Sequence, residues 1–298
     1  MGNKTLIPSV LKTGDTIGIA APASPFDRNR FIKGISMLES MGFNTYTPEE
    51  IYNVKGYLAG TDYQRAAIIN NLFSDTNIKA VFFARGGFGS MKLLPLLDYS
   101  VISNNPKILI GYSDISALLA AIYKKCGLVS FHGPMLTTLG YASKKAIRSM
   151  LSVLTSQSDI KIKMNRAVVL TPGKVSGILL GGNLSTLCHL TGTPYLPNFK
   201  GRILFIEDRH EALYRIDRML THMKLAGCFK GLAGLVIGSF TECGPVKKVY
   251  ELIQDLFKEY DIPVLAGLEA GHGKENLTIP FGLKTELDTD SKTLSFKW

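Results

Sequence analysis

The sequence predicts an α/β fold in two parts: an N-terminal domain built on a doubly wound, mostly parallel sheet, and a C-terminal α/β domain with a smaller, less regular sheet. Two observations predict it. In the first half, short continuous apolar runs alternate with segments of helical periodicity, which is typical of parallel strands covered on both faces. After about residue 170, strand-like segments and turns dominate. The 298 residues, 46% of them hydrophobic, suffice for two cores.

The first half repeats a strand, loop and helix unit. The apolar stretch 16–24 predicts a strand, and the periodic stretch 28–43 predicts a helix that ends near Gly42. The same pattern continues with a helix over 61–75, a strand over 78–87, a helix over 89–98, a strand over 107–114 and a helix over 115–127. Because functional groups gather where parallel strands end, the loops after residues 20, 84 and 111 are expected to share one edge.

A polar stretch, "LTSQSDIKIKMNRAV", followed by "TPGK", predicts the connection between the two parts. We place the domain boundary between residues 168 and 169, so that the domains span 1–168 and 169–298. The second domain is expected to contain two strong helices, over 212–227 and 246–260.

Composition excludes several classes of protein. The longest apolar stretches, such as 231–240, fall well short of the roughly 18 residues of a membrane span. The first ten residues lack an apolar secretory core, and Leu6 stands where a myristoylation signal has Ser or Thr, so a cytoplasmic protein without membrane insertion is expected.

The cysteines and charges also limit the function. Four widely spaced cysteines, without a CxxC pair, favour reduced thiols over a disulfide framework or a zinc ribbon. The net charge of +10 is spread along the chain, so nucleic-acid binding is not expected. A basic enzyme that acts on small acidic peptides or sugars would show the same balance. No HExxH pair is present, and neither a metal nor another cofactor is expected.

Ser113 lies between a strand-like run and a helix-like run in "LIGYSDISALL". An abrupt turn from strand to helix exposes the side chain at the turn and directs the helix N-terminus at an anion formed there, as a nucleophilic serine requires. Gly111 would keep that turn uncrowded. The stretch departs from the GxSxG pattern, since Ile115 replaces the second glycine, and Ser113 could instead simply cap the helix.

The loop "ARGGFGS" (84–90) offers backbone N–H groups without side-chain obstruction, as an oxyanion hole or anion nest requires. It fits neither GxGxxG nor GxxxxGK[ST], so it is not a phosphate loop. The alternative is an ordinary tight turn between strand and helix.

A nucleophilic serine needs a base, and five histidines are present. His272, between two glycines in "EAGHGKEN", is predicted to be accessible, whereas His132 and His189 have apolar neighbours that suggest satisfied core positions. A carboxylate to orient the base is offered by Glu207 or Asp208, at the end of the strand-like "RILFIED". Either carboxylate could instead cap a helix or pair with a nearby arginine.

Seven segments occur in a recognisable order: "GDTIGIAAPAS", "ARGGFGSMKLLPLLDY", "IGYSDISALL", "FHGPM", "GGNLSTLCHLTGTPYLP", "LFIEDRHEALYRIDRMLTHM" and "PVLAGLEAGHGKENLTIPFG". Together they resemble the LD-carboxypeptidase family, the serine peptidases that include muramoyltetrapeptide carboxypeptidases and microcin-immunity peptidases. The resemblance covers nearly the whole chain.

The resemblance implies a catalytic triad of Ser113 as nucleophile, His272 as general base and acid, and Glu207 as the carboxylate that orients it. It implies an oxyanion hole from the backbone N–H groups of Asp114 and Gly87. The N-terminal domain would carry the serine and the C-terminal domain the other two residues, with the site in the cleft between them.

The implied substrate is a small peptide or muropeptide, a peptidoglycan tetrapeptide cut before its terminal D-Ala during cell wall recycling, and the implied assembly is a homodimer. Arg85 could hold the terminal carboxylate, or pair with Asp98 or Asp114. Asn183 could shape the cleft, or hold a turn after a strand.

Two alternatives stay open at this point. A microcin-immunity type peptidase would cleave an aminoacyl-nucleotide amide and needs an aromatic platform for the base. The only tryptophan, Trp298, is the last residue, which weakens that alternative, although Phe or Tyr could stack instead. A non-catalytic muropeptide-binding protein would use the same cleft without chemistry.

Overall fold

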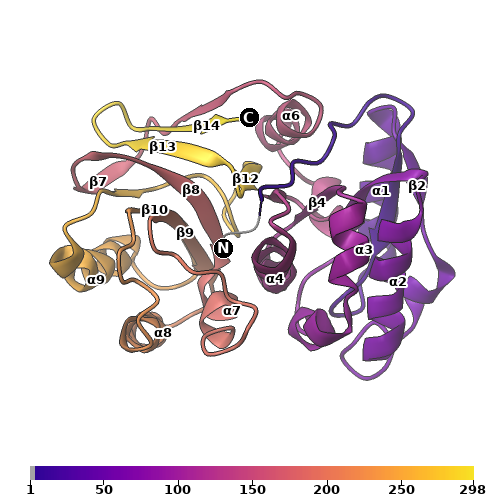
Figure 1. Ribbon diagram of the computed structural model, residues 1–298, viewed down its shortest axis with the longest axis horizontal. Helices are drawn as coiled ribbons and strands as arrows, with labels where there is room; N and C mark the ends of the chain where they lie inside the picture. The colour runs from indigo at the N-terminus through magenta and orange to yellow at the C-terminus, as the bar shows by residue number, and fades with distance from the viewer. Residues whose placement is uncertain (1–3) are drawn as a thin grey trace.

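The computed structural model describes residues 4–298 and contains two sheets side by side, each packed with helices (Figure 1). The first sheet has six strands in the order β12-β5-β4-β3-β1-β2, all parallel except β12. Its strands are β1 (Thr16–Ala20), β2 (Asn44–Tyr46), β3 (Ile78–Phe83), β4 (Ile108–Gly111), β5 (Ser130–His132) and β12 (Ile279–Phe281). The predicted doubly wound, mostly parallel sheet is confirmed.

Several helices of the first half begin at local signals in the sequence. The side chain of Asp27 caps the first helix, and Thr61 forms a capping box with Gln64 at the second. The helices are α1 (Arg28–Ser40), α2 (Asp62–Ser74), α3 (Tyr99–Asn104), α4 (Ser116–Cys126), α5 (Leu136–Leu139) and α6 (Lys144–Leu154).

The α-helix expected over 89–98 is wrong in type. Ser90–Leu96 forms a 3-10 helix with Pro95 inside it, and proline removes a backbone N–H that a regular α-helix would use. Further 3-10 turns occupy Glu49–Tyr52, Ser113–Ile115 and Lys258–Tyr260.

The second sheet is mixed, with the order β6-β14-β13-β8-β9-β10-β11-β7. It is less regular, as expected, but its eight strands exceed the six of the first sheet, where a smaller sheet was expected. The strands are β6 (Ile160–Lys163), β7 (Val168–Thr171), β8 (Lys174–Asn183), β9 (Arg202–Arg209), β10 (Gly234–Thr241), β11 (Val264–Ala266), β13 (Lys284–Asp288) and β14 (Thr293–Lys297). Its helices are α7 (Leu184–His189), α8 (Leu213–Leu225) and α9 (Val246–Phe257).

The two parts of the chain exchange strands. β12, from the C-terminal part, pairs antiparallel with β5 and extends the first sheet, with Ile279 opposite His132. β6 precedes residue 168 yet pairs with β14 in the second sheet. The expected boundary between residues 168 and 169 falls within β7. A cut at any one position would therefore divide a sheet.

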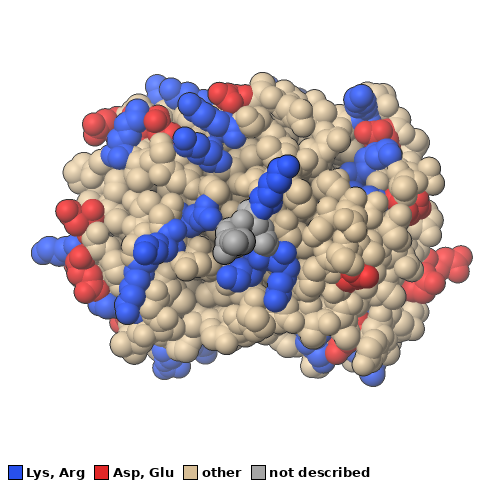
Figure 2. Space-filling view, viewed as in Figure 1, with Lys and Arg blue, Asp and Glu red and all other residues tan. Residues whose placement is uncertain are grey.

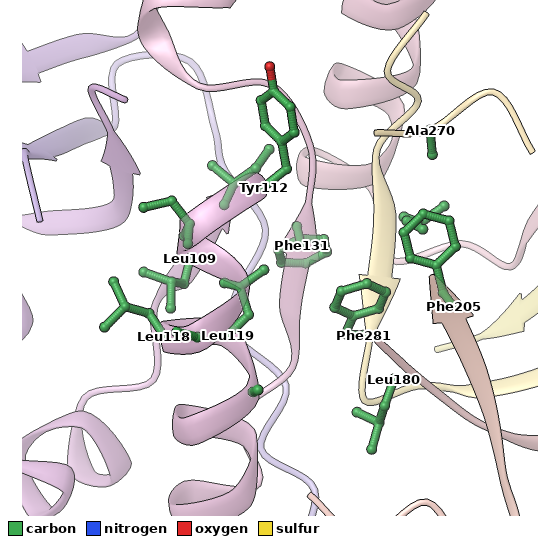
Figure 3. Close-up of a cluster of buried hydrophobic side chains, with 14 of the residues drawn as sticks. Leu109, Tyr112, Leu118, Leu119, Phe131, Leu180, Phe205, Ala270 and Phe281 are labelled. Atoms are coloured by element: carbon green, nitrogen blue, oxygen red, sulfur yellow. The ribbon is translucent and has the colours of Figure 1, made fainter. Parts of the chain in front are cut away.

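The buried side chains form one hydrophobic cluster that includes residues of both sheets. Figure 3 shows part of it: Phe131 and Leu119 come from the first half, and Phe281, Phe205 and Leu180 face them from the second. Helix α4 packs against β8 and α7, so it lies between the two sheets (Figure 1). This shared core holds the two parts at a fixed distance.

The remaining expectations concern thiols, charge and membranes. All four cysteines are free, and Cys126 and Cys243 are buried. On the face shown in Figure 2, basic side chains lie in separate groups divided by uncharged surface. Within residues 4–298, no helix combines the length and apolarity needed to cross a bilayer. Residues 1–3, the start of the segment inspected for a leader, lie outside the described residues.

The shared core predicts cooperative unfolding. Phe281→Ala is expected to lower the free energy of unfolding by about 3–5 kcal/mol, because it removes a buried ring that packs near Phe205 and His132. Urea denaturation, followed by fluorescence and circular dichroism, should show one transition for the wild type and for the variant. Two separate transitions, with only one moved by the substitution, would contradict a shared core.

Candidate active site

Ser113 follows β4 and begins a 3-10 turn that leads directly into α4. Its φ is 63°, a left-handed conformation that a residue other than glycine rarely adopts. Helix α4 has no side-chain cap at its N-terminus, so the structure does not give Ser113 the capping role. A strained turn with the serine at its tip is the geometry expected of a nucleophile.

Two glycines make room for this turn. A Cβ at Gly111 would lie 2.7 Å from Cγ2 of Ile115, and a Cβ at Gly86 would lie 3.1 Å from Cβ of Ser113. The same position at Gly86 is 3.5 Å from the backbone nitrogen of Asp114. The loop after β3 therefore passes directly beside Ser113 and the N–H that comes after it.

The glycine loop is built for close approach of backbone. Gly87 has φ 112°, and a Cβ there would lie 2.4 Å from the hydroxyl of Ser24. The positive φ and the closeness of Ser24 both exclude a side chain at this position. Gly87 therefore lines the pocket beside Ser113 with its backbone. The carboxylate of Asp114 accepts the N–H of Ser90 at 2.9 Å, which ties the turn at Ser113 to the end of the glycine loop.

Glu207 and His272 are joined directly. Glu207 lies near the end of β9 and is fully buried, and its Oε2 accepts hydrogen bonds from Nδ1 of His272 at 2.7 Å and from the His272 backbone N–H at 3.1 Å. Gly271 makes this possible: it has φ 104°, and a Cβ there would lie 2.4 Å from Glu207 Oε2. The carboxylate thus fixes both the ring and the backbone of His272.

Glu207 also sets the charge of the imidazole. Burial alone would lower the pKa of His272, but the hydrogen bond and the negative charge of Glu207 outweigh burial and raise the pKa above its ordinary value. With Nδ1 directed at the carboxylate, Nε2 is the nitrogen left to exchange a proton with a partner.

Asp208, the other candidate carboxylate, faces a different set of groups. It accepts hydrogen bonds from the Asn183 side chain and the Ser185 N–H, both at 2.9 Å. Burial and the charge of Glu207 raise its pKa to about 6. Asn183 in turn caps α7 through the N–H of Thr186. Asn183 is buried and does not line the pocket beside Ser113, so its contacts match the turn-holding alternative.

One pocket of about 520 Å³ brings the candidates together. It is lined by Asp27, Arg30, Arg85, Gly86, Gly87, Tyr112, Ser113, Met135, Thr137, Thr138, Arg209, His210 and His272. The loops after β1, β3 and β4 all contribute, which confirms the expectation that they share one edge. Ser113 and His272 therefore face the same space. Among the hydrogen bonds of residues 4–298, none joins these two side chains.

Arg85 is exposed, and its guanidinium donates to the Pro25 carbonyl at 3.0 Å. Among the ion pairs of the described residues, none joins Arg85 to Asp98 or Asp114. The side chain thus lies at the pocket rim with its charge available.

His132 and His189, which the sequence predicts to be satisfied core residues, only partly match that prediction. His132 is fully buried, as expected, but neither ring nitrogen has a hydrogen-bond partner among the described residues. Desolvation lowers its pKa to about 4, so it is neutral. His189 is exposed at the end of α7, and the expectation of a core position is wrong because the short helix turns its last residue outward.

Sequence reasoning did not single out five pocket residues that carry a ring or a charge: Asp27, Arg30, Tyr112, Arg209 and His210. The Tyr112 ring lies 4.8 Å from the His272 ring, centre to centre. Its position next to Ser113 was the available signal. Arg30 lies in α1 and Arg209 ends β9, but nothing in their local sequence distinguishes them from other surface arginines. Among residues 4–298, no group of His, Cys, Asp or Glu is arranged to hold a metal ion.

Models of two known protein domains match most of the chain. The model of the LD-carboxypeptidase N-terminal domain matches residues 17–133, and that of the LD-carboxypeptidase C-terminal domain matches residues 176–287. The chain is 38% identical to a Bacillus subtilis (strain 168) protein named "Probable murein peptide carboxypeptidase", over 96% of this chain and 92% of that one. The chain belongs to the LD-carboxypeptidase family.

Two further relatives also match over nearly their whole length. The Microcin C7 self-immunity protein MccF of Escherichia coli is 34% identical, over 97% of this chain and 95% of that protein. The crystal structure of an MccF-like protein from Bacillus anthracis str. Ames superimposes with a TM-score of 0.92 at 28% identity, covering 98% and 99% of the two chains. The predicted resemblance and fold are confirmed, and the family is one of serine-type hydrolases.

The Glu207–His272 contact predicts a measurable shift. Glu207→Gln should lower the pKa of His272 below its ordinary value, because burial then acts without the carboxylate that outweighs it. Histidine ring resonances, followed by NMR through a pH titration, give this pKa directly. Asp208→Asn is the neighbouring control and should shift it less, since its charge is a smaller influence. An unchanged pKa of His272 in Glu207→Gln would contradict the conclusion that the Glu207 carboxylate raises it.

Proposed function

We propose that the chain is a serine carboxypeptidase that hydrolyses the L,D-peptide bond to the terminal D-Ala of peptidoglycan tetrapeptides, in cell wall recycling. The observation that carries the proposal is that a strained Ser113 and a carboxylate-bound His272 line one pocket. The name of the Bacillus subtilis relative, "Probable murein peptide carboxypeptidase", supports peptidoglycan peptides as the substrate class.

In the proposed mechanism, Nε2 of His272 takes the proton of the Ser113 hydroxyl as its oxygen attacks the scissile carbonyl carbon. Glu207 stabilises the resulting imidazolium through Nδ1. The tetrahedral intermediate collapses as Nε2–H protonates the leaving amine of D-Ala. Water, deprotonated by the same nitrogen, then hydrolyses the acyl-enzyme and restores Ser113.

The oxyanion would lie between the backbone N–H groups of Asp114 and Gly87. Asp114 is the second residue of a helical turn, and the first N–H groups of such a turn have no partner within it. The close passage of Gly86 beside Asp114 brings the glycine loop to the same place. Loss of one such donor typically slows turnover by roughly 10²- to 10³-fold. Arg85, at the pocket rim, is proposed to hold the D-Ala carboxylate, and a homodimer stays a prediction.

A second candidate is the cleavage of an aminoacyl-nucleotide amide. The similarity to MccF favours it, together with Tyr141, which is 56% exposed and lines a space next to the pocket where a base could stack. Trp298 lies against Phe131 instead and lines neither space. Assaying an aminoacyl sulfamoyl adenosine beside the tetrapeptide, at equal concentrations, ranks the two candidates by kcat/KM.

Ser113→Ala should abolish the release of D-Ala from L-Ala-D-Glu-L-Lys-D-Ala and from its diaminopimelate counterpart. The melting temperature should stay within a few degrees, because one oxygen is removed from a side chain that faces a pocket. Quenched mass spectrometry of the wild type should detect the acyl-enzyme. An active variant would exclude Ser113 as nucleophile, and an inactive wild type that still binds the peptides would indicate a binding protein.

The base predicts the pH dependence. His272 must be neutral to accept the proton, and Glu207 holds the pKa of His272 above that of an ordinary histidine, so kcat/KM should fall as the pH drops through a midpoint above the ordinary histidine range. The rate of D-Ala release, measured at low substrate concentration from about pH 5 to about pH 9, gives this midpoint. A midpoint clearly below that of an ordinary histidine would show that another group is the base.

A further inference from the structure

The pocket beside Ser113 continues past His272 into a second space of about 340 Å³, which we call the arm. It is lined by Arg30, Tyr112, Pro134, Thr137, Thr138, Tyr141, Ala142, Ser143, Ala146, Arg209, Gly271, His272, Gly273, Lys274 and Asn276. Arg30, Tyr112, Arg209 and His272 line both spaces, so the two are continuous. Ser113 and the glycine loop line only the first.

The charges of the arm all have one sign. Its charged side chains, apart from the ring of His272, are Arg30, Arg209 and Lys274, and no Asp or Glu lines it. Arg209 is paired with Glu242 at 2.8 Å. Arg30 and Lys274 are exposed, and neither occurs in an ion pair among residues 4–298.

Three carboxylates close to the lining residues are engaged with other groups, and Glu207 among them is bound to His272. Asp27 caps α1 through the N–H of Arg30, and Glu275 accepts the hydroxyl of Ser143. In addition, the side-chain nitrogen of Asn276 is buried without a hydrogen-bond partner among the described residues, while its oxygen accepts the Gly271 N–H. The arm therefore offers cations and an unused N–H donor, and no carboxylate lines it to accept them.

We propose that the arm is a subsite for a carboxylate on the acyl part of the peptide, held by Arg30, Lys274 and the Asn276 amide; this rests on the proposed function above. D-Ala is a single residue whose carboxylate is assigned to Arg85 in the first pocket. The arm is thus left for the residues that stay on the enzyme. A lysine ammonium there meets cations and no acid, whereas a carboxylate meets opposite charge and a hydrogen-bond donor.

Two carboxylates of a tetrapeptide could fill the arm: the α-carboxylate of D-Glu, and the side-chain carboxylate of diaminopimelate. Both have the same chemistry. Four peptides separate them, combining D-Glu or D-isoglutamine at the second position with diaminopimelate or lysine at the third. Calorimetry on the Ser113→Ala variant measures binding without turnover. The release of D-Ala is measured separately on the wild-type protein.

On Ser113→Ala, removing the carboxylate that the arm binds should weaken affinity about tenfold, since a charged hydrogen bond is lost. Adding Arg30→Gln or Lys274→Gln should weaken binding of the carboxylate peptide by a similar factor and leave its uncharged counterpart nearly unchanged. Lys33→Gln is the matched control: it lies on α1 near Arg30, over the same Tyr141 ring at 4.6 Å, but does not line the arm.

The outcomes separate the subsite from the reaction. If the four peptides bind equally, if none binds, or if Lys33→Gln has the same effect as Arg30→Gln, the arm is not a carboxylate subsite. If binding shows the expected pattern but the wild type releases no D-Ala from any peptide, the subsite stands and the proposed reaction is wrong. If affinity falls when D-isoglutamine replaces D-Glu, the arm binds the α-carboxylate of D-Glu. If affinity falls when lysine replaces diaminopimelate, the arm binds the side-chain carboxylate of diaminopimelate.

Discussion

The hydrogen bond between Glu207 and His272 is the interaction on which the candidate site depends. A buried carboxylate is costly unless charge and hydrogen bonds compensate it, and here both come from one residue, through the ring and the backbone of His272. The geometry leaves no alternative at the neighbouring position, because any side chain at Gly271 would collide with the carboxylate. Charge, backbone conformation and ring orientation are therefore determined together.

That pair is useful only if it stays opposite Ser113, and the pairing of β12 with β5 accomplishes this. β12 comes a few residues after the His272 loop and joins the sheet whose neighbouring strand, β4, ends just before Ser113. Phe205 and Phe281 then pack around His132 between the two sheets. A hinge between the parts would have to break a strand pair and open a core. The serine and the imidazole thus line one pocket.

The sequence predicts local features and those that parallel topology imposes. Strand ends placed the loops after residues 20, 84 and 111 at one edge, and the flanking glycines singled out His272. Spacing could not decide between Glu207 and Asp208, because adjacent residues at a strand end both reach polar surroundings; only the position of the His272 loop separates them. β12 could not be predicted either, since three residues that include Pro280 are a weak strand signal until β5 lies beside them. The arm likewise depends on residues brought together only by folding.

The cations of the cleft and the proposed role of His272 as base place opposite demands on its imidazole. Arg209, at the junction of pocket and arm, lowers the pKa of His272, and an imidazolium next to such cations is disfavoured. A carboxylate at hydrogen-bonding distance, buried where solvent screens it little, is what offsets both the cations and the burial. Glu242 reduces the same conflict at the surface by pairing with Arg209. If exposed arginines bind an anion in this cleft and His272 is the base, as proposed, a buried acid is needed behind the imidazole, and Glu207 occupies that position.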